Sequence, residues 1–217
     1  MPMPRPLQQD PIAAAPLTES LRALARRGVV SHLRKGAQII TEGDRGDTLY
    51  ILLSGRLRAY SVGPDDKQVT YAVHGPGEYV GEMGLDGGLR SAHVETLQAS
   101  VCVVVSRATL ERHLAEDPGF AFELLSRVIR RARMATQGMR QFALVDVYGR
   151  LKDLLERQAQ GSMPFVWDPA PSHKEMSQML GCTPAMVTIV LGELRKGSYV
   201  QIGRRQLVLL RPLPMNW

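Results

Sequence analysis

A carboxylate, a guanidinium and several glycines gather in one short stretch of the chain. Gly81-Glu82-Met83-Gly84-Leu85 is followed, after four residues, by Arg90-Ser91-Ala92. Carboxylates accept hydrogen bonds from sugar hydroxyls, whereas a guanidinium, a hydroxyl and backbone N–H groups suit a phosphate. Glycines allow tight turns and a close approach to a ligand. The spacing therefore predicts that Glu82 and Arg90 face one cavity, with a surface ion pair between them as the alternative.

A second stretch, Ser172–Val187, has the pattern of two short helices joined by a tight turn. Ser172 and Glu175 form a capping box for the first helix, and Gly181 suits a left-handed turn. Thr183 and Pro184 are suited to the cap and the first position of the next helix. The pattern predicts a helix-turn-helix.

A hairpin is expected directly after this motif. The apolar runs Tyr199–Ile202 and Gln206–Leu210 flank Gly203-Arg204-Arg205, so two arginines would lie at the tip. A helix-turn-helix followed by such a wing is typical of DNA-binding domains, and a purely structural helical hairpin is the alternative.

The elements that must position the first stretch are short strands. Apolar runs alternate with turns rich in Gly, Asp and Pro between Gly36 and Ser106, which predicts an antiparallel sandwich or jelly roll. The runs are Ala37–Ile40, Leu49–Leu53, Leu57–Val62, Gln68–Val73, His93–Leu97 and Val101–Val105. Before them we expect a mobile, proline-spaced arm over residues 1–16 and a short helix over 17–27 with Thr18 as its cap.

Helical periodicity follows the strands. Apolar residues recur with alternating spacings of three and four, the pattern of a coiled-coil seam, in the predicted helix 118–145. The seam consists of Leu125, Val128, Ala132, Ala135, Met139 and Phe142. We interpret it as a dimer interface, with packing on the chain's own β-domain as the alternative. Asp146 suits the cap of a further helix, so Val145 and Asp146 are the expected hinge.

Composition narrows the classes of protein. The chain has 217 residues, 44% of them hydrophobic, and a formal net charge of +6. The basic charge favours nucleic acid as a partner. Cys102 and Cys182 are too few for a disulfide scaffold or a four-cysteine metal site, and we read both as structural. With neither a membrane span nor a secretory signal apparent, a cytoplasmic location is the default expectation.

Three further motifs precede these two stretches: Gly36-x-x-Ile39, Glu42-Gly43-Asp44 and Asp47-x-Leu49-Tyr50-Ile51-Leu52-x-x-Gly55. Together with the two stretches, they resemble the Crp/Fnr (cyclic-AMP receptor protein) family of bacterial transcription regulators. The resemblance covers roughly residues 30–211. It implies an α+β fold with an antiparallel cyclic-nucleotide-binding β-roll, a long dimerisation helix and a C-terminal winged helix-turn-helix. The expected domains are 17–117, 118–145 and 146–217, after the arm 1–16.

The resemblance also implies roles for single residues. Glu82 would hold a ribose 2′-hydroxyl, and Arg90 and Ser91 a cyclic phosphate, beside the backbone of Gly81, Met83 and Ala92. The loop before Arg90 is slightly shorter than in most members.

On the long helix, members that bind cyclic AMP carry a Thr and a Ser against the base. Ala135 and Thr136 stand there in this chain, so one hydroxyl is lost. Cyclic AMP is favoured as the effector, and cyclic GMP and cyclic di-GMP are alternatives.

The second departure concerns the recognition helix. The family presents Arg-Glu and a further Arg there, whereas this chain has Pro184, Ala185 and Ile189. Thr183, Thr188 and apolar contacts from Ala185, Met186 or Ile189 with thymine methyls remain for reading bases. Specificity is therefore expected to be lower, to lean toward A·T, or to come from DNA shape. The candidates for phosphate contact are Lys174, Arg195, Lys196, Arg204 and Arg205.

These observations predict a homodimeric transcription regulator that binds double-stranded DNA under the control of a cyclic nucleotide, with RNA polymerase as a further partner. The nucleotide is an allosteric effector, and we expect no resident cofactor, no metal and no enzymatic activity. Two alternatives stay open. One is a constitutive DNA-binding regulator with a vestigial sensor, and the other is a nucleotide-binding module that acts through protein partners.

Overall fold

The structure is a computed structural model that describes residues 10–161 and 163–215, without the side chains of residues 65 and 141–143. Its internal contacts divide the chain into two compact units. The first holds the chain up to Ser61 together with Thr70–Arg130, and the second holds Val62–Val69 together with Arg131–Trp217.

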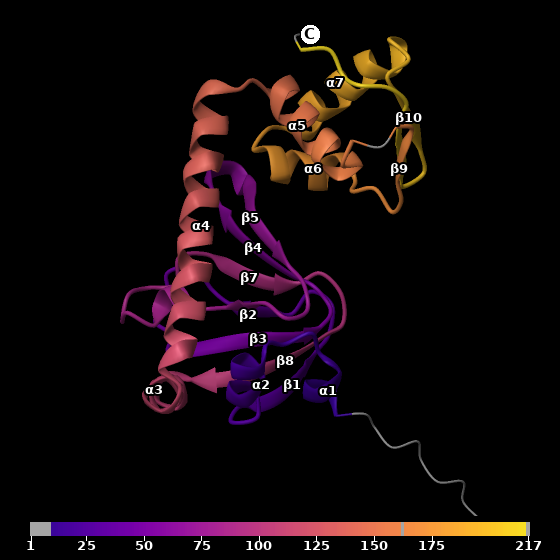
Figure 1. The fold of residues 1–217 in the computed structure, drawn as a ribbon. Helices are drawn as coiled ribbons and strands as arrows, with labels where there is room; N and C mark the ends of the chain where they lie inside the picture. The colour runs from indigo at the N-terminus through magenta and orange to yellow at the C-terminus, as the bar shows by residue number, and fades with distance from the viewer. Residues whose placement is uncertain (1–9, 162, 216–217) are drawn as a thin grey trace, which may run out of the picture. The chain divides into compact units, whose positions relative to one another are not determined.

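Antiparallel strands build most of the first unit. They are β1 (Val29–Leu33), β2 (Gln38–Ile40), β3 (Thr48–Ser54), β4 (Leu57–Val62), β5 (Gln68–His74), β6 (Tyr79–Val80), β7 (His93–Thr96) and β8 (Ser100–Ser106). They form two four-stranded sheets with the orders β1-β8-β3-β6 and β2-β7-β4-β5 (Figure 1). The predicted α+β class with an antiparallel β-domain is confirmed, and each predicted strand is present within a residue or two. Strands β1 and β6 were not predicted.

Strand β3 is apolar on both of its faces because both faces are covered. Leu49 and Leu53 pack with two helices, α1 (Pro11–Ala14) and α2 (Glu19–Ala25). Leu52, which points to the opposite face, packs between the two sheets. Since side chains alternate along a strand, this double burial explains the unbroken apolar run of β3.

The predicted mobile arm is wrong for residues 10–16. The Asp10 side chain caps α1 by accepting a hydrogen bond from the backbone N–H of Ile12 at 3.0 Å. Ile12 and Ala15 are buried in the core of the first unit. The Arg22 guanidinium in α2 donates hydrogen bonds to four backbone carbonyls between residues 12 and 17. This segment is therefore part of the β-domain, whereas residues 1–9 lie outside the described residues.

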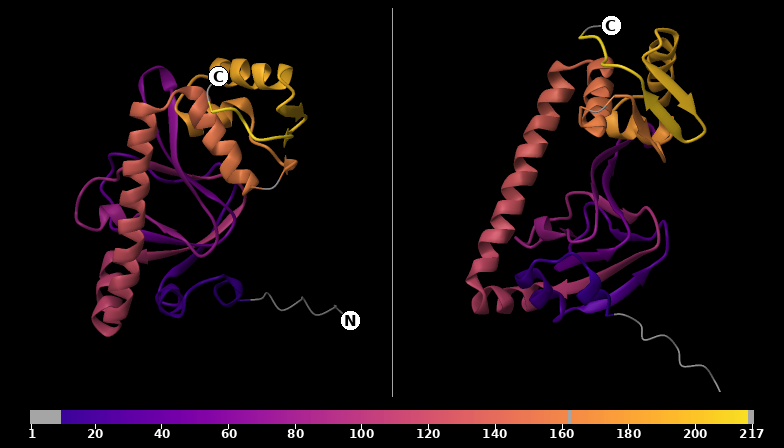
Figure 2. Two further views of the ribbon diagram at one scale, coloured as in Figure 1. Left: turned by 45° about the horizontal axis from the view of Figure 1, so that its top comes forward. Right: turned by 45° about the vertical axis from the view of Figure 1, so that its right-hand side comes forward.

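Helices follow the sheets. They are α3 (Arg107–Glu116), which was not predicted, α4 (Pro118–Leu144) and α5 (Val147–Ala159). Figure 2 shows α4 as one unbroken helix, which is the long helix expected from the periodicity. Two short 3-10 turns, η1 (Pro64–Asp66) and η2 (Glu82–Gly84), lie in the loops of the β-domain.

The second unit contains the predicted helix-turn-helix and wing. Helices α6 (His173–Leu180) and α7 (Pro184–Lys196) precede the hairpin of β10 (Val200–Gly203) and β11 (Gln206–Leu209). An unpredicted strand, β9 (Phe165–Trp167), pairs with β11 and completes a three-stranded sheet. The core lies between these helices and this sheet and includes Leu151, Met176, Leu191 and Leu209. In the part of the chain that the structure describes, no helix combines the length and the apolar character that crossing a bilayer requires.

The burial of α1 can be tested by mutation. Ile12→Ala should lower the free energy of unfolding by about 2 kcal/mol, because it deletes buried methyl groups from the core. Chemical denaturation followed by circular dichroism measures the change. The control is Ala13→Ser at the neighbouring exposed position, which should leave stability within about 0.5 kcal/mol of the parent. Equal stability of both variants would mean that residues 10–16 are an unattached arm after all.

Candidate functional sites

Three glycines surround the guanidinium of Arg90. A Cβ added to Gly46 would lie 2.3 Å from Nε of Arg90, and one added to Gly81 would lie 2.9 Å from Nη1. At Gly84 the corresponding distance to Nη1 is 3.1 Å. Gly81 also has a φ of +97°, which disfavours any other residue. Gly81 and Gly84, which we expected to admit a ligand, therefore make room for the chain's own arginine.

Arg90 is buried and donates its hydrogen bonds to the chain itself. Its Nη1 donates to the Gly81 carbonyl at 2.7 Å. Its Nη2 donates to the carbonyl and to the hydroxyl of Thr48, both at 3.0 Å. Since Thr48 begins β3, the guanidinium ties this strand to the turn that carries Glu82. Only two of the five guanidinium N–H groups remain for a ligand.

The predicted phosphate-binding residues fall into buried and exposed groups. Glu82 and Arg90 have exposed fractions of 9% and 6%, so the alternative of an ion pair on a surface turn is wrong. Ser91 is exposed, and its hydroxyl donates a weak hydrogen bond to the sulfur of Met83 at 3.4 Å. Met83 is 59% exposed and Ala92 is half-buried. Among the predicted phosphate-binding residues, Ser91 therefore offers a hydroxyl that solvent or a ligand can reach.

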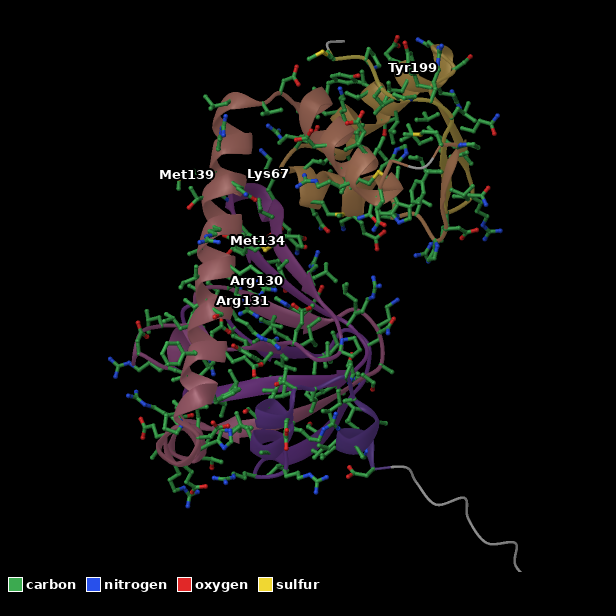
Figure 3. All side chains as sticks on the ribbon, viewed as in Figure 1. Lys67, Arg130, Arg131, Met134, Met139 and Tyr199 are labelled. Atoms are coloured by element: carbon green, nitrogen blue, oxygen red, sulfur yellow. The ribbon has the colours of Figure 1, made fainter. Side chains whose placement is uncertain are left out.

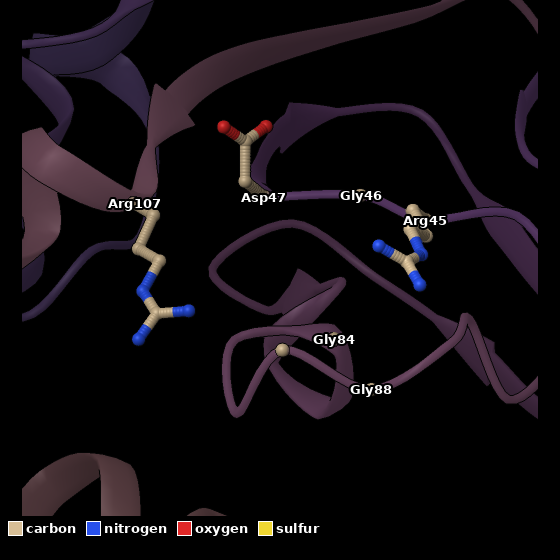
Figure 4. A pocket seen from close by; sticks show the side chains of 7 residues that line it. Arg45, Gly46, Asp47, Gly84, Gly88 and Arg107 are labelled. Atoms are coloured by element: carbon tan, nitrogen blue, oxygen red, sulfur yellow. The ribbon is translucent and has the colours of Figure 1, made fainter.

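A hollow of about 250 Å³ lies between the loop 84–88 and the segment before β3 (Figure 4). It is lined by Arg45, Gly46, Asp47, Gly84, Gly87, Gly88 and Arg107. Sequence reasoning did not single out Arg45, which lies between two of the family motifs, or Arg107, which has no motif around it. Neither Glu82 nor Ser91 lines this hollow, so it is separate from the side chains that were predicted to hold a nucleotide.

The predicted seam on α4 is exposed in the single chain. Leu125, Val128 and Met139 have exposed fractions of 53%, 43% and 71%. Ala132 and Ala135 are exposed as well, and the side chain of Phe142 lies outside the described set. Other exposed apolar residues of α4 are Phe122, Ile129, Met134 and Leu144, and Figure 3 marks Met134 and Met139 along the helix. Packing of Leu125 and Val128 on the β-domain of their own unit is therefore not observed.

Thr136 uses the hydroxyl that was expected to face a base. Its Oγ1 donates to the backbone carbonyl of Ala132 at 3.0 Å, one turn earlier in α4. The oxygen can still accept a hydrogen bond from a ligand, but its proton is engaged within the helix.

The expected hinge is closely connected to the helix-turn-helix. Asp146 caps α5 as predicted, because its carboxylate accepts a hydrogen bond from the Gly149 N–H at 2.7 Å. Arg150, which sequence reasoning missed, donates to the Val145 carbonyl at 2.6 Å and to the Leu180 carbonyl at 2.9 Å. One guanidinium therefore joins Val145 of the expected hinge to Leu180 at the end of α6.

The predicted caps of the helix-turn-helix are present. Ser172 and Glu175 make a full capping box at the start of α6. Gly181 ends α6 with a φ of +61°, as the turn requires. The Thr183 hydroxyl accepts a hydrogen bond from the Met186 N–H at 3.3 Å, and Pro184 opens α7.

The side chains that were predicted to contact DNA lie at the surface of the second unit. Those exposed there are Lys174, Thr183, Pro184, Ala185, Met186, Thr188, Ile189, Arg195, Lys196, Arg204 and Arg205. Arg204 and Arg205 are the two loop residues between β10 and β11, as expected for a wing tip. Lys196 forms an ion pair with Glu193 at 2.7 Å.

One contact of α7 was not foreseen. The Thr188 hydroxyl lies 2.8 Å from Nδ1 of His173, the first residue of α6, and donates to the Pro184 carbonyl at 2.9 Å. Nothing in the sequence around His173 marked it as a partner of α7, because the contact depends on how the two helices pack.

Both cysteines have the properties of structural residues. Burial raises the pKa of the Cys102 thiol to about 12. Burial also raises the pKa of Cys182, and the nearby Arg150 lowers it by less. Neither thiol is a thiolate at neutral pH. No group of three or more His, Cys, Asp or Glu among the described residues is placed to hold a metal ion.

Comparison with known proteins agrees with this architecture. Residues 30–117 match the family model of the cyclic nucleotide-binding domain. A CRP-like cAMP-activated global transcriptional regulator of Mycobacterium tuberculosis is 24% identical over 208 residues, covering 92% of this chain and 89% of the relative. A cyclic AMP receptor protein of Thermus thermophilus is 28% identical over 171 residues, which cover 78% of each chain.

Solved structures share the fold at lower identity. The c-di-GMP responsive global regulator CLP of Xanthomonas campestris aligns with a TM-score of 0.78 at 21% identity, covering 88% of this chain and 98% of the other. FixK2 of Bradyrhizobium japonicum aligns with a TM-score of 0.70 at 22% identity, covering 85% and 93%.

The burial of Arg90 predicts a structural effect that needs no ligand. Arg90→Ala should lower the free energy of unfolding of the ligand-free protein by about 2–4 kcal/mol, because it leaves buried carbonyls without donors and opens a void. Thermal and chemical denaturation without nucleotide measure this loss. The control is Arg45→Ala, an exposed neighbour, with an expected change below about 0.5 kcal/mol. Unchanged stability of Arg90→Ala would contradict the structural role.

Proposed function

We propose that this chain belongs to the Crp/Fnr family of bacterial transcription regulators, which the domain match and the similar regulators support, and that it is a homodimeric, ligand-gated DNA-binding regulator. Its relatives are transcription regulators rather than enzymes. The effector is a cyclic nucleotide, and the regulated partner is double-stranded DNA.

The observation that carries the DNA-binding part is the capped helix-turn-helix with a basic wing. Lys174 on α6, Arg195 on α7 and Arg204 and Arg205 on the wing are all exposed in the same unit. Exposed cations of this kind attract the phosphate backbone and release its counterions on binding. The proposed duplex contact therefore draws its affinity from these cations.

The effector would bind at the turn between β6 and β7. Glu82 offers a carboxylate to a ribose hydroxyl, and Ser91 offers an exposed hydroxyl to the cyclic phosphate. Arg90 contributes through the two N–H groups that Gly81 and Thr48 leave unused. The domain match supports a cyclic nucleotide, with cyclic AMP favoured and cyclic GMP and cyclic di-GMP as alternatives.

Gating requires that the ligand favours the DNA-competent state over the resting state. A phosphate at Ser91 that recruits more than the two unused N–H groups of Arg90 competes with Thr48 for the guanidinium, and the position of β3 then depends on the ligand. The hinge Val145–Asp146 would carry the response to the winged domain, and Arg150 connects that hinge to α6. The sequence-derived domains 17–117, 118–145 and 146–217 are part of this proposal.

The dimer would form along α4, where the apolar stripe of Leu125, Val128 and Met139 is exposed. Ala132 and Ala135 allow two such helices to approach closely. RNA polymerase is proposed as a further partner from the family alone.

A second candidate is a constitutive DNA-binding regulator whose sensor is vestigial. The observation in its favour is the engagement of Arg90, since a guanidinium bound to backbone carbonyls holds the β-domain together without any nucleotide.

Nucleotide binding distinguishes the two candidates. Calorimetry with cyclic AMP, cyclic GMP and cyclic di-GMP should detect binding of at least one, and Ser91→Ala should weaken it about fivefold through the loss of one hydrogen bond. Ser54→Ala, an exposed serine at the end of β3, is the control and should bind as the parent does. If none of the three nucleotides binds up to millimolar concentration while DNA is still bound, the constitutive candidate is correct.

The salt dependence of DNA binding tests the wing. Replacing both Arg204 and Arg205 by Ala should weaken binding to all duplexes and reduce the slope of log K against log salt by about two per subunit. Arg34→Ala/Lys35→Ala removes the same charge from the first unit and is the matched control. Equal slopes for the two double variants, measured by fluorescence anisotropy, would remove the wing from the proposed interface.

A further inference from the structure

The N-terminal half of α7 presents an exposed surface without charges or amides. Its exposed side chains are those of Pro184, Ala185, Met186, Thr188 and Ile189. Met186 and Ile189 are 40% and 59% exposed, although both are large apolar side chains. An exposed apolar surface of this kind indicates a binding partner. The partner should offer apolar groups to α7 and negative charges to the basic residues on the neighbouring elements.

Both hydroxyls on this surface are already engaged. Thr183 accepts the hydrogen bond that caps α7. The Thr188 hydroxyl lies within hydrogen-bond distance of both the Pro184 carbonyl and Nδ1 of His173. Both threonine hydroxyls therefore take part in the fold of the motif, and the proton of Thr183 is the hydroxyl donor that stays available. The large exposed side chains of this surface offer methyl and methylene groups for contact.

Gly192 extends this surface by one further turn. A Cβ added there would meet no atom within 4 Å, so no packing in the described chain demands a glycine. A glycine inside a helix costs about 1 kcal/mol relative to alanine. An open, bare position on the outer side of α7 allows the helix backbone to approach a partner closely.

Charge decides which partner fits. Lys174, Arg195, Arg204 and Arg205 are exposed on the elements that surround this surface, and they complement the phosphates of a duplex. In the major groove, the apolar group on a base edge is the 5-methyl of thymine. Other base edges there offer polar groups, which Met186 and Ile189 cannot bind.

We propose that α7 recognises the 5-methyl groups of thymine through Met186 and Ile189. The inference rests on the proposed DNA-binding function and names the chemistry that this chain reads. The half-site then contains T·A pairs where these side chains reach the groove. Discrimination arises from burial of methyl groups, while Lys174 and the wing arginines contribute affinity for any sequence.

Replacement of thymine by uracil tests the inference, because it removes only the 5-methyl group. Duplexes are first selected from a random pool by the full-length protein, with and without cyclic AMP, cyclic GMP and cyclic di-GMP. The best duplex is then synthesised with deoxyuridine in place of each thymidine of the half-sites. Affinity should fall about fourfold for each contacted methyl.

Variants assign the effect to the two side chains. In Met186→Ala/Ile189→Ala, binding should be weaker and the difference between the thymine and uracil duplexes should disappear. Met215→Ala removes an 88% exposed methionine from the same unit and should keep the full difference. Circular dichroism confirms that the variants are folded, as expected for exposed positions.

The outcomes separate this inference from the proposed function. A selected duplex that binds equally well with uracil overturns the inference and leaves DNA binding intact. A loss on uracil substitution that persists in Met186→Ala/Ile189→Ala also overturns it, because the effect would then come from DNA shape. If the selection recovers no duplex under any condition, the DNA-binding proposal fails together with the inference. The apolar surface would then be interpreted as a binding site for a protein partner.

Discussion

The first unit depends on one buried guanidinium. Arg90 carries a positive charge into a site that is 6% exposed, and the charge is stabilised there by the carbonyls of Gly81 and Thr48. A buried charge without such partners would be strongly unfavourable. Gly46 and Gly84 provide the space for the guanidinium, because a Cβ at either position would contact it. The turn around Glu82, the start of β3 and the loop before β3 are therefore all held in position by contact with the Arg90 guanidinium.

The same arginine is the group that a cyclic phosphate would need. Three of its five N–H groups are engaged with the chain, so a phosphate that recruits more than two must displace Thr48 or Gly81. In the proposed function, ligand binding and the position of β3 would be coupled through this competition for hydrogen bonds. Such a coupling gives the ligand different affinities for two states, which is the physical requirement for an allosteric effector.

Local signals were predictable from the sequence, and distant contacts were not. Asp146, Ser172 and Thr183 act as caps in the structure because a cap depends on the three or four residues that follow it. The sequence also placed Glu82 and Arg90 in one glycine-rich stretch, and both are buried in the structure. It did not predict where the guanidinium points, because the Thr48 carbonyl lies 42 residues earlier in the chain. Strands β1, β6 and β9 and helix α1 were missed for a related reason. They are short, and pairing or burial against distant segments stabilises them.

The winged unit separates affinity from specificity. Its exposed cations attract phosphates wherever they occur, so this part of the binding energy is independent of sequence. The N-terminal half of α7 would contribute mainly apolar contacts, and each methyl group that it buried would be worth less than a bidentate contact to guanine. A single half-site read in this way discriminates weakly. In the proposed dimer, two copies of α7 would contact two half-sites, and both half-sites must match at a fixed spacing. The discrimination of a single half-site would therefore be squared. In the proposed dimer, the exposed stripe of α4 would therefore be as necessary for specificity as α7.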